Sequence, residues 1–349
     1  MTKNISSITR GPRQSNIELL RIIAMFLVLI VHADFLVLDA PTYNDFISNP
    51  INAWTRTFFE SASIVCVNIF ILISGWFGIK FTYKGLMNFL FQCIYFICGL
   101  YILAVLLGYA RWTTTTMVSC LVLLKSNWFV LSYIGLYILA PALNIFIKKA
   151  SKLQYKKLLI LFFLFQTLYG WTGTTKWIMA GYSTFSFIGL YLLAGYVRKY
   201  GWKFVTNWGG GVIYVATIPI ISISYWFMKK YNIHGDMYAY INPLVILASL
   251  GIVLSFHKMD IRHSKIINKI AASSFAVFLL HFDPQFFSII YKPIINELYN
   301  NYQGTTCLFM IFGFLCCVFL MSVIIDQPRR WFWSMLQKKY GHLITETDE

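Results

Sequence analysis

Three ionisable side chains stand in an otherwise apolar stretch near the start of the sequence. They are Glu18, Arg21 and His32, in SNIELLRIIAMFLVLIVHADF. At about 100° per residue, Arg21 and His32 fall within about 20° of one another around a helix, and Glu18 lies about 60° away on the other side. The helix rise separates Arg21 from His32 by about 16 Å. A cation at one end of such a helix can bind an anionic substrate, and an imidazole further along can perform acid–base chemistry.

A second imidazole interrupts the late apolar stretch SSFAVFLLHFDPQFF, where His281 is followed by Asp283 and Pro284. Proline breaks or kinks a helix, and the carbonyl groups that it frees need a polar environment. Glu60 begins another apolar stretch at a depth comparable to His32, where a carboxylate can orient an imidazole and stabilise its protonated form. These positions predict a polar cavity within a helix bundle.

Each of these side chains also has a purely structural interpretation. Arg21 can extend to the lipid headgroups with Glu18 as its partner, and His32 can make a single hydrogen bond between helices. Glu60 can be a carboxylate at headgroup level, and His281 can serve structure alone. The shared face of Glu18, Arg21 and His32 favours the functional interpretation. It predicts a corridor that opens to the cytoplasm at Arg21 and ends near His32.

The composition places these groups in a membrane protein. Of 349 residues, 58% are hydrophobic and 12% are charged, about half of the charged fraction of soluble globular domains. The net charge of +16 does not indicate a nucleic-acid partner, because the basic residues form short clusters between apolar stretches and no reading motif accompanies them. The seven cysteines contain no C-x-x-C pair, so neither a metal site nor a disulfide framework is expected.

Apolar stretches of the length that crosses a bilayer, about 20 residues, predict an all-α polytopic membrane bundle with about ten transmembrane helices. The expected spans are residues 17–38, 61–79, 86–109, 128–147, 158–172, 184–198, 207–228, 241–257, 270–290 and 305–325. The stretch Thr113–Leu124 contains four consecutive threonines, which argues against a further full span.

The distribution of basic residues predicts how these spans are oriented. The segments on the side of the N-terminus carry 21 Lys and Arg residues, and the segments on the other side carry 7. Because positive charge favours the cytoplasmic side, both termini are expected in the cytoplasm. We expect one membrane domain at residues 16–335, with cytoplasmic tails at 1–15 and 336–349.

Five segments of the chain carry recognisable patterns. Arg21 and His32 form an Arg-x10-His pattern in the first span. The other segments are VNIFILISGWF with Ser74 and Gly75, NWFVLSYIGLYILAPALN at 127–144, FIGLYLLAGYVRK at 187–199, and SSFAVFLLH ending at His281. In this order the segments resemble the acyltransferase type 3 family of bacterial integral membrane acyltransferases.

The resemblance implies transfer of an acyl group, commonly acetyl from cytoplasmic acetyl-CoA, to a hydroxyl of an envelope saccharide or a lipid-linked glycan. It implies that His32 is catalytic, as a general base or as the site of a covalent intermediate, and that Arg21 binds the donor. Many relatives carry Arg-x-x-Arg after the Ser-Gly segment, where this chain has Lys80 and Lys84; these lysines are further donor-binding candidates. The expected supporting residues are Glu18, Glu60, Ser74, Trp128, Tyr133 and His281.

The resemblance further implies no bound cofactor, with acyl-CoA as a substrate, and a multi-pass location in the bacterial inner membrane. A transporter or flippase of an envelope precursor is the alternative, because broken helices and buried His and Arg also suit translocation. Two similar halves with matched broken spans are missing from the sequence, which weighs against it. A third class is a sensor or assembly protein whose buried charges only pair helices.

Overall fold

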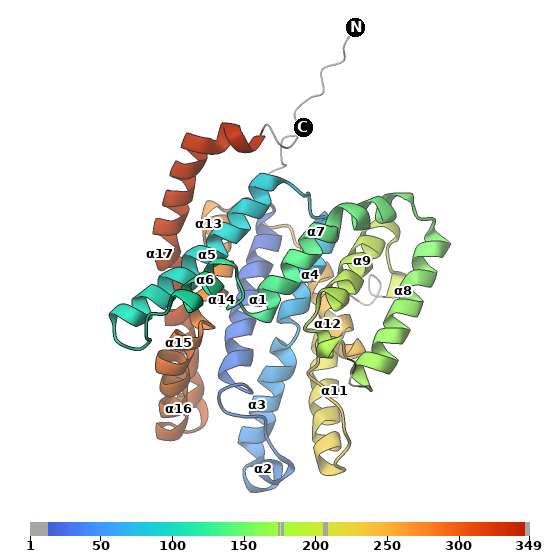
Figure 1. Cartoon of the computed structure of the whole chain (residues 1–349). Coiled ribbons are helices and arrows are strands. Elements are labelled where there is room, and N and C mark those ends of the chain that lie inside the picture. The colour runs from blue at the N-terminus through green and yellow to red at the C-terminus, as the bar shows by residue number, and fades with distance from the viewer. Residues whose placement is uncertain (1–12, 174, 176–177, 205–208, 346–349) are drawn as a thin grey trace.

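The chain is a bundle of α-helices in the computed structural model, which describes residues 13–173, 175, 178–204 and 209–345. Helix α1 (Ser15–Ala33) lies near the centre of the bundle and contacts α3, α4, α12, α13, α14 and α17 (Figure 1). The described residues contain helices and no strand, so the all-α prediction is confirmed.

The remaining elements follow α1 along the chain. They are α2 (Tyr43–Ser48), α3 (Pro50–Ser63), α4 (Cys66–Phe77), α5 (Tyr83–Leu106), α6 (Thr114–Leu121), α7 (Trp128–Lys149), α8 (Lys152–Gln166), the π-helical turn η1 (Thr167–Trp171), the 3-10 turn η2 (Met179–Gly181), α9 (Thr184–Tyr200), α11 (Gly210–Lys230), α12 (Pro243–Lys258), α13 (Lys265–Ala271), α14 (Ser274–His281), α15 (Pro284–Phe286), the π-helical turn η3 (Phe287–Tyr291), α16 (Lys292–Asn301) and α17 (Gly304–Thr345).

Six helices among the described residues are long and apolar enough to cross a membrane, or seven if one bent pair counts as a span. Each of the ten predicted spans falls on helical structure within the described residues, and positions 207 and 208 of the seventh lie outside them. One of them falls on α8, which continues directly into η1, and two fall on α9 and α12, which have 17 and 16 residues. Helices of 16 and 17 residues extend about 24–26 Å, less than the roughly 30 Å of hydrocarbon. The chain therefore has the helices of a membrane protein, and the count of ten spans stays a prediction.

The bent pair lies where the sequence predicts a broken helix. Lys265–His281 and Pro284–Asn301 meet at an angle of 65°. Asp283 caps the second segment, because its Oδ1 accepts hydrogen bonds from the N–H groups of Gln285 and Phe286. Pro284 is tolerated in the first turn after this cap, because the N–H groups of a first turn have no hydrogen-bond partner within the helix. The bend therefore ends α14 at His281 and fixes where that imidazole stands.

The predicted tails differ in how much of them the structure describes. Residues 1–12 lie outside the described part of the chain. At the other end, α17 is 42 residues long and continues through Thr345, so most of the predicted tail at 336–349 is helical.

The Ser-Gly segment of α4 packs closely on α9. A Cβ atom added at Gly75 would overlap the backbone carbonyl of Tyr191 on α9. Tyr191 also anchors the turn that follows α4, since its hydroxyl donates to Asn144 Oδ1 at 2.7 Å and accepts from the Ile79 N–H at 2.8 Å. The small residue at position 75 therefore sets the distance between two of the central helices.

We expect Gly75→Ala to lower the free energy of unfolding by about 1–3 kcal/mol, because an added methyl group in a closely packed contact forces backbone movement. The thermal midpoint of the purified protein in detergent measures this. Gly99→Ala on α5 is the matched control, because a Cβ atom there meets nothing within 4 Å. Equal midpoints for the two variants would contradict the packing role of Gly75.

Candidate functional site

Two imidazoles from distant parts of the sequence meet in the bundle. His32 Nδ1 on α1 lies 2.8 Å from His281 Nε2 on α14. His281 is fully buried, and His32 is partly exposed. The contact joins the last residue of α14, placed by the bend described above, to the end of the polar stripe on α1. The sequence identified both residues, and the structure brings them together.

The hydrogen bonds around this pair determine the tautomers of the two rings. His281 Nδ1 lies 2.6 Å from the backbone carbonyl of Val277. A carbonyl can only accept, so His281 Nδ1 carries a hydrogen, and in the neutral ring His281 Nε2 is an acceptor. His32 Nδ1 must then donate to it. The lone pair of the neutral His32 ring is therefore on Nε2, the nitrogen that can accept a proton from a substrate.

Aromatic side chains hold both rings in place. The His32 ring lies against Phe282 with a centroid separation of 4.3 Å, and the His281 ring lies 5.5 Å from the Tyr291 ring. Tyr291 is fully buried and donates a hydrogen bond of 2.6 Å to the Leu29 carbonyl of α1. These contacts connect the bent segment to α1 and keep the imidazole pair in one geometry.

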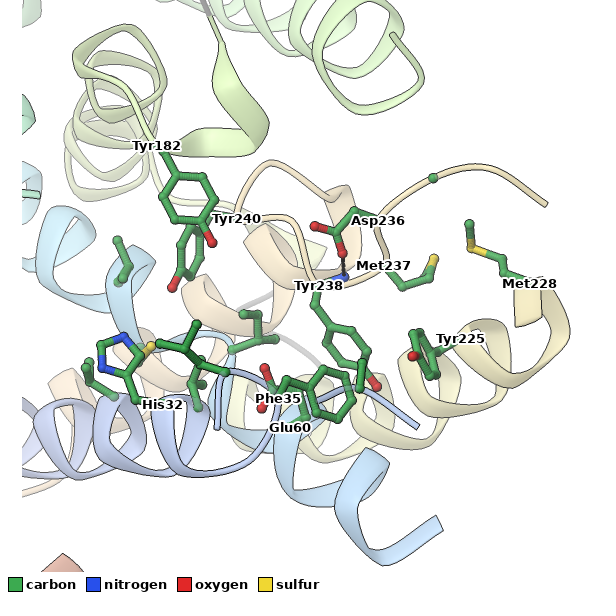
Figure 2. Close-up of a pocket in the computed structure, with 18 of the residues that line it drawn as sticks. His32, Phe35, Glu60, Tyr182, Tyr225, Met228, Asp236, Met237, Tyr238 and Tyr240 are labelled. Atoms are coloured by element: carbon green, nitrogen blue, oxygen red, sulfur yellow. Dashed lines mark hydrogen bonds between the residues drawn. The ribbon is translucent and has the colours of Figure 1, made fainter. Parts of the chain in front are cut away.

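His32 lines a cavity of about 730 Å³, which we call the His32 cavity. Nine of its 26 lining residues are Phe, Trp or Tyr. The aromatic lining residues are Phe35, Trp128, Phe129, Tyr182, Tyr225, Tyr238, Tyr240, Phe278 and Phe282. Figure 2 shows His32 and Glu60 along one side of this space, with Tyr182 and Tyr240 across from His32. At the rim, the Asp236 carboxylate accepts a hydrogen bond of 2.9 Å from the Tyr238 N–H (Figure 2).

Glu60 on α3 is a buried carboxylate in the wall of the His32 cavity. It is 2% exposed, and its Oε2 has no hydrogen-bond partner among the described residues. The nearby Arg56 is already paired, because its Nε lies 2.6 Å from Asp34 Oδ1. The burial argues against a headgroup-level role for Glu60. The hydrogen bond that orients His32 comes from His281, so Glu60 faces the cavity as a separate polar contact.

A second cavity, of about 320 Å³, lies along α1 on the side of Arg21, and we call it the Arg21 cavity. Arg21 Nη1 donates to Glu18 Oε1 at 2.9 Å, and its side chain is 37% exposed. Arg13, which is exposed, also lines this cavity. Two guanidinium groups therefore stand at its outer end, where they can meet an anionic ligand.

The two cavities adjoin one another and share four apolar lining residues. Val28, Val67, Phe129 and Phe278 line both of them. Val28 lies one helical turn before His32 and two turns after Arg21. The polar stripe of α1 thus runs from the Arg21 cavity past these shared residues to His32 in the other cavity.

The other predicted site residues are placed as follows. Trp128 lines the His32 cavity, and Tyr133 and Ser74 line the Arg21 cavity, where their hydroxyl oxygens lie 3.3 Å apart. Lys80 and Lys84 are exposed and line neither cavity. The structure therefore does not bring these two lysines to the polar groups of α1, and their donor-binding role stays a prediction.

Several residues of these cavities escaped the sequence reasoning. Arg13 lies before the first apolar stretch, and Gln92 and Ser274 are neutral polar residues of α5 and α14. Asp236 and Tyr238 come from the loop between α11 and α12. The buried amide of Gln92 in an apolar helix was a detectable signal, whereas the loop residues had none.

The comparison with protein families assigns the class of this protein. A family model described as an acyltransferase domain, that of the acyltransferase type 3 family, matches residues 14–326. The match covers most of the chain, including α1, the bent segment and every lining residue of the two cavities except Arg13, and the chain belongs to this family. No curated protein and no solved structure matches the chain significantly. The protein is thus a member of a family of membrane acyltransferases.

Proposed function

We propose that this protein transfers an acyl group, acetyl in the simplest case, from cytoplasmic acyl-CoA to a hydroxyl of a cell-envelope saccharide across the bacterial inner membrane. The observation that carries the proposal is the position of His32. The neutral ring has its lone pair on Nε2, and it stands where two cavities meet, one cationic and one aromatic.

The donor enters from the Arg21 cavity in this proposal. The excess of basic residues on the N-terminal side supports a cytoplasmic position for this end of α1. Arg13 and Arg21 at the outer end of the cavity bind the phosphates of CoA, because guanidinium groups pair well with phosphate oxygens. The acyl-bearing arm extends along α1 and passes Val28 and Phe278, which line both cavities, to reach His32.

The reaction uses the lone pair of His32 Nε2. As a general base, this nitrogen takes the proton of the acceptor hydroxyl while the hydroxyl oxygen attacks the thioester carbonyl. The new C–O bond forms, the C–S bond breaks, and the CoA thiolate leaves and receives the proton from the imidazolium. His281 stabilises the charged His32 ring during this step by accepting the hydrogen bond from Nδ1.

The acceptor occupies the His32 cavity. Aromatic faces pack against the apolar faces of sugar rings, and a carboxylate accepts hydrogen bonds from hydroxyl groups. Trp128, Tyr240 and Glu60 supply both kinds of contact beside His32. An acceptor with several hydroxyl groups can place one of them at His32 Nε2 while another reaches Glu60 Oε2.

We expect Glu60→Ala to raise the acceptor KM about fivefold, because it removes one hydrogen bond, worth about 1 kcal/mol. The KM for acetyl-CoA should stay within about twofold of the wild type. Glu297→Ala on the exposed face of α16 is the control. A Glu60→Ala protein with an unchanged acceptor KM would remove Glu60 from the acceptor site.

The proposal is tested with purified protein in proteoliposomes and acetyl-CoA labelled in the acetyl group. Envelope glycan fractions are added on the side opposite to the donor. Label recovered on glycan as an alkali-labile ester supports acyl transfer. Movement of unmodified glycan across the bilayer without label incorporation supports the transporter alternative and contradicts the proposal.

A further inference from the structure

Buried polar atoms without a hydrogen-bond partner gather at the Arg21 cavity. Among the described residues, seven side chains have such an atom, and three of these side chains line this cavity: Glu18, Gln92 and Ser274. Gln92 is 7% exposed and Ser274 is 3% exposed. Leaving a buried polar group without a partner costs about 1–3 kcal/mol, so such a cluster in a cavity wall points to a ligand that supplies the partners.

Gln92 and Ser274 lie on neighbouring helices at the inner part of this cavity. The Phe89 ring of α5 stacks on the Phe275 ring of α14 at a centroid separation of 5.2 Å. Gln92 follows Phe89 by about one helical turn, and Ser274 precedes Phe275. The two polar side chains therefore stand along one seam between α5 and α14. Gln92 Nε2 and Ser274 Oγ have no hydrogen-bond partner among the described residues.

The chemistry of these atoms fits an uncharged ligand that both donates and accepts hydrogen bonds. Gln92 Nε2 can only donate, whereas Ser274 Oγ can donate and accept. An amide group offers the matching carbonyl oxygen and N–H. Phosphate would instead be drawn to Arg13 and Arg21 at the outer end of the cavity. The inner pair is thus suited to amides and the outer pair to phosphates.

The depth of Ser274 agrees with the arm of the donor. Ser274 and His281 are seven residues apart on α14, a rise of about 10 Å. CoA carries two amide groups in its pantetheine arm, between the thiol and the phosphates. With the thioester carbon at His32, the nitrogens of these amides lie about four and about eight bonds along the arm. At about 3.5 Å for three extended bonds, these distances are about 5 Å and about 9 Å. The second amide of the arm therefore reaches the level of Ser274, and the first lies between Ser274 and His32.

We infer that Gln92 and Ser274 form the subsite that recognises the pantetheine amides of the donor. The inference rests on the proposed function, since it assumes acyl-CoA in the Arg21 cavity. It gives the enzyme a means to recognise the arm itself, apart from the nucleotide. A simple nucleotide phosphate can satisfy the arginines, but it leaves the Gln92 and Ser274 atoms without partners.

The test measures the binding of two probes to purified protein by calorimetry. One probe is CoA, and the other is adenosine 3′,5′-bisphosphate, which lacks the arm. We expect Gln92→Leu and Ser274→Ala each to weaken CoA binding about fivefold, the equivalent of one ordinary hydrogen bond, while the Kd of the bisphosphate stays unchanged. If Gln92→Leu does not fold, Gln92→Asn takes its place in the test. This variant shortens the side chain but keeps the amide, and it should weaken CoA binding in the same way.

The chain offers matched controls for both substitutions. Gln166 and Ser63 are also buried with unpaired side-chain atoms, but they line neither cavity. Gln166→Leu and Ser63→Ala should bind both probes like the wild type. Gln92 and Ser274 variants that bind CoA like the wild type, or that lose both probes equally, overturn the subsite. Failure of the wild type to bind CoA at all overturns the proposed donor as well.

Discussion

Replacement of His32 by alanine is expected to lower the rate of acyl transfer by about 10²- to 10⁴-fold, the contribution of a positioned general base. The substitution removes the one nitrogen whose lone pair the His281 hydrogen bond leaves available at the junction of the cavities. The initial rate of transfer from labelled acetyl-CoA in proteoliposomes measures the effect. CoA binding should change little, because Arg13 and Arg21 lie at the other end of the corridor.

A histidine outside the cavities serves as the control for this substitution. His263 is exposed and lines neither cavity, and His263→Ala should retain the wild-type rate. The thermal midpoint of His32→Ala should match the wild type closely enough to show a folded protein. A folded His32→Ala protein that keeps more than about one tenth of the wild-type rate contradicts a catalytic role.

The helical character of the fold and the polar stripe on α1 could be predicted from the sequence. Three ionisable groups at a helical spacing in an apolar stretch have few physical explanations, and in the structure Glu18 and Arg21 line one cavity while His32 lines the next. The break after His281 was also readable, because Pro284 cannot continue a helix without a cost. These features depend on local sequence alone.

The number of transmembrane spans, unlike the helical fold, could not be predicted from local sequence. An apolar stretch shows that a segment avoids water, but it does not show whether the segment crosses a bilayer or packs inside a bundle. Helix α12 is apolar and has 16 residues, and the predicted spans at 158–172 and 184–198 fall on the short helices α8 and α9. Helix α9 is largely buried against α4 and α7, so its apolar residues serve protein packing.

Most of the site depends on contacts between segments far apart in the sequence. His32 and His281 are separated by 249 positions, and nothing in either stretch indicates that the two rings share a hydrogen bond. Gln92 and Ser274 are common polar residues whose meaning appears only when α5 and α14 lie side by side at a cavity. The sequence therefore identified His32 and His281 one by one but not the contact between them, and it missed Gln92 and Ser274.

The pairing of the two imidazoles leads to the second large expected effect. His281→Leu should lower kcat about 10- to 100-fold, the usual cost of removing a group that orients a functional imidazole. Without the acceptor at His281 Nε2, the His32 ring is free to place its hydrogen on the nitrogen that faces the substrate. It also loses the hydrogen bond that stabilises its charged form. Steady-state kinetics with labelled acetyl-CoA measure kcat and KM separately.

A substitution of His281 that keeps only its hydrogen-bond acceptor distinguishes a role in orienting His32 from a role in packing. In His281→Gln the side-chain carbonyl can accept the hydrogen bond from His32 Nδ1, so it should recover much of the activity that His281→Leu loses. Both variants should bind CoA like the wild type, because His281 does not line the Arg21 cavity. Equal losses of kcat in the two variants, together with lowered thermal midpoints, would make His281 a packing residue. Leucine and glutamine fill similar volumes, but only glutamine can accept the hydrogen bond from His32. If only the glutamine variant recovers kcat, the recovery therefore depends on that hydrogen bond.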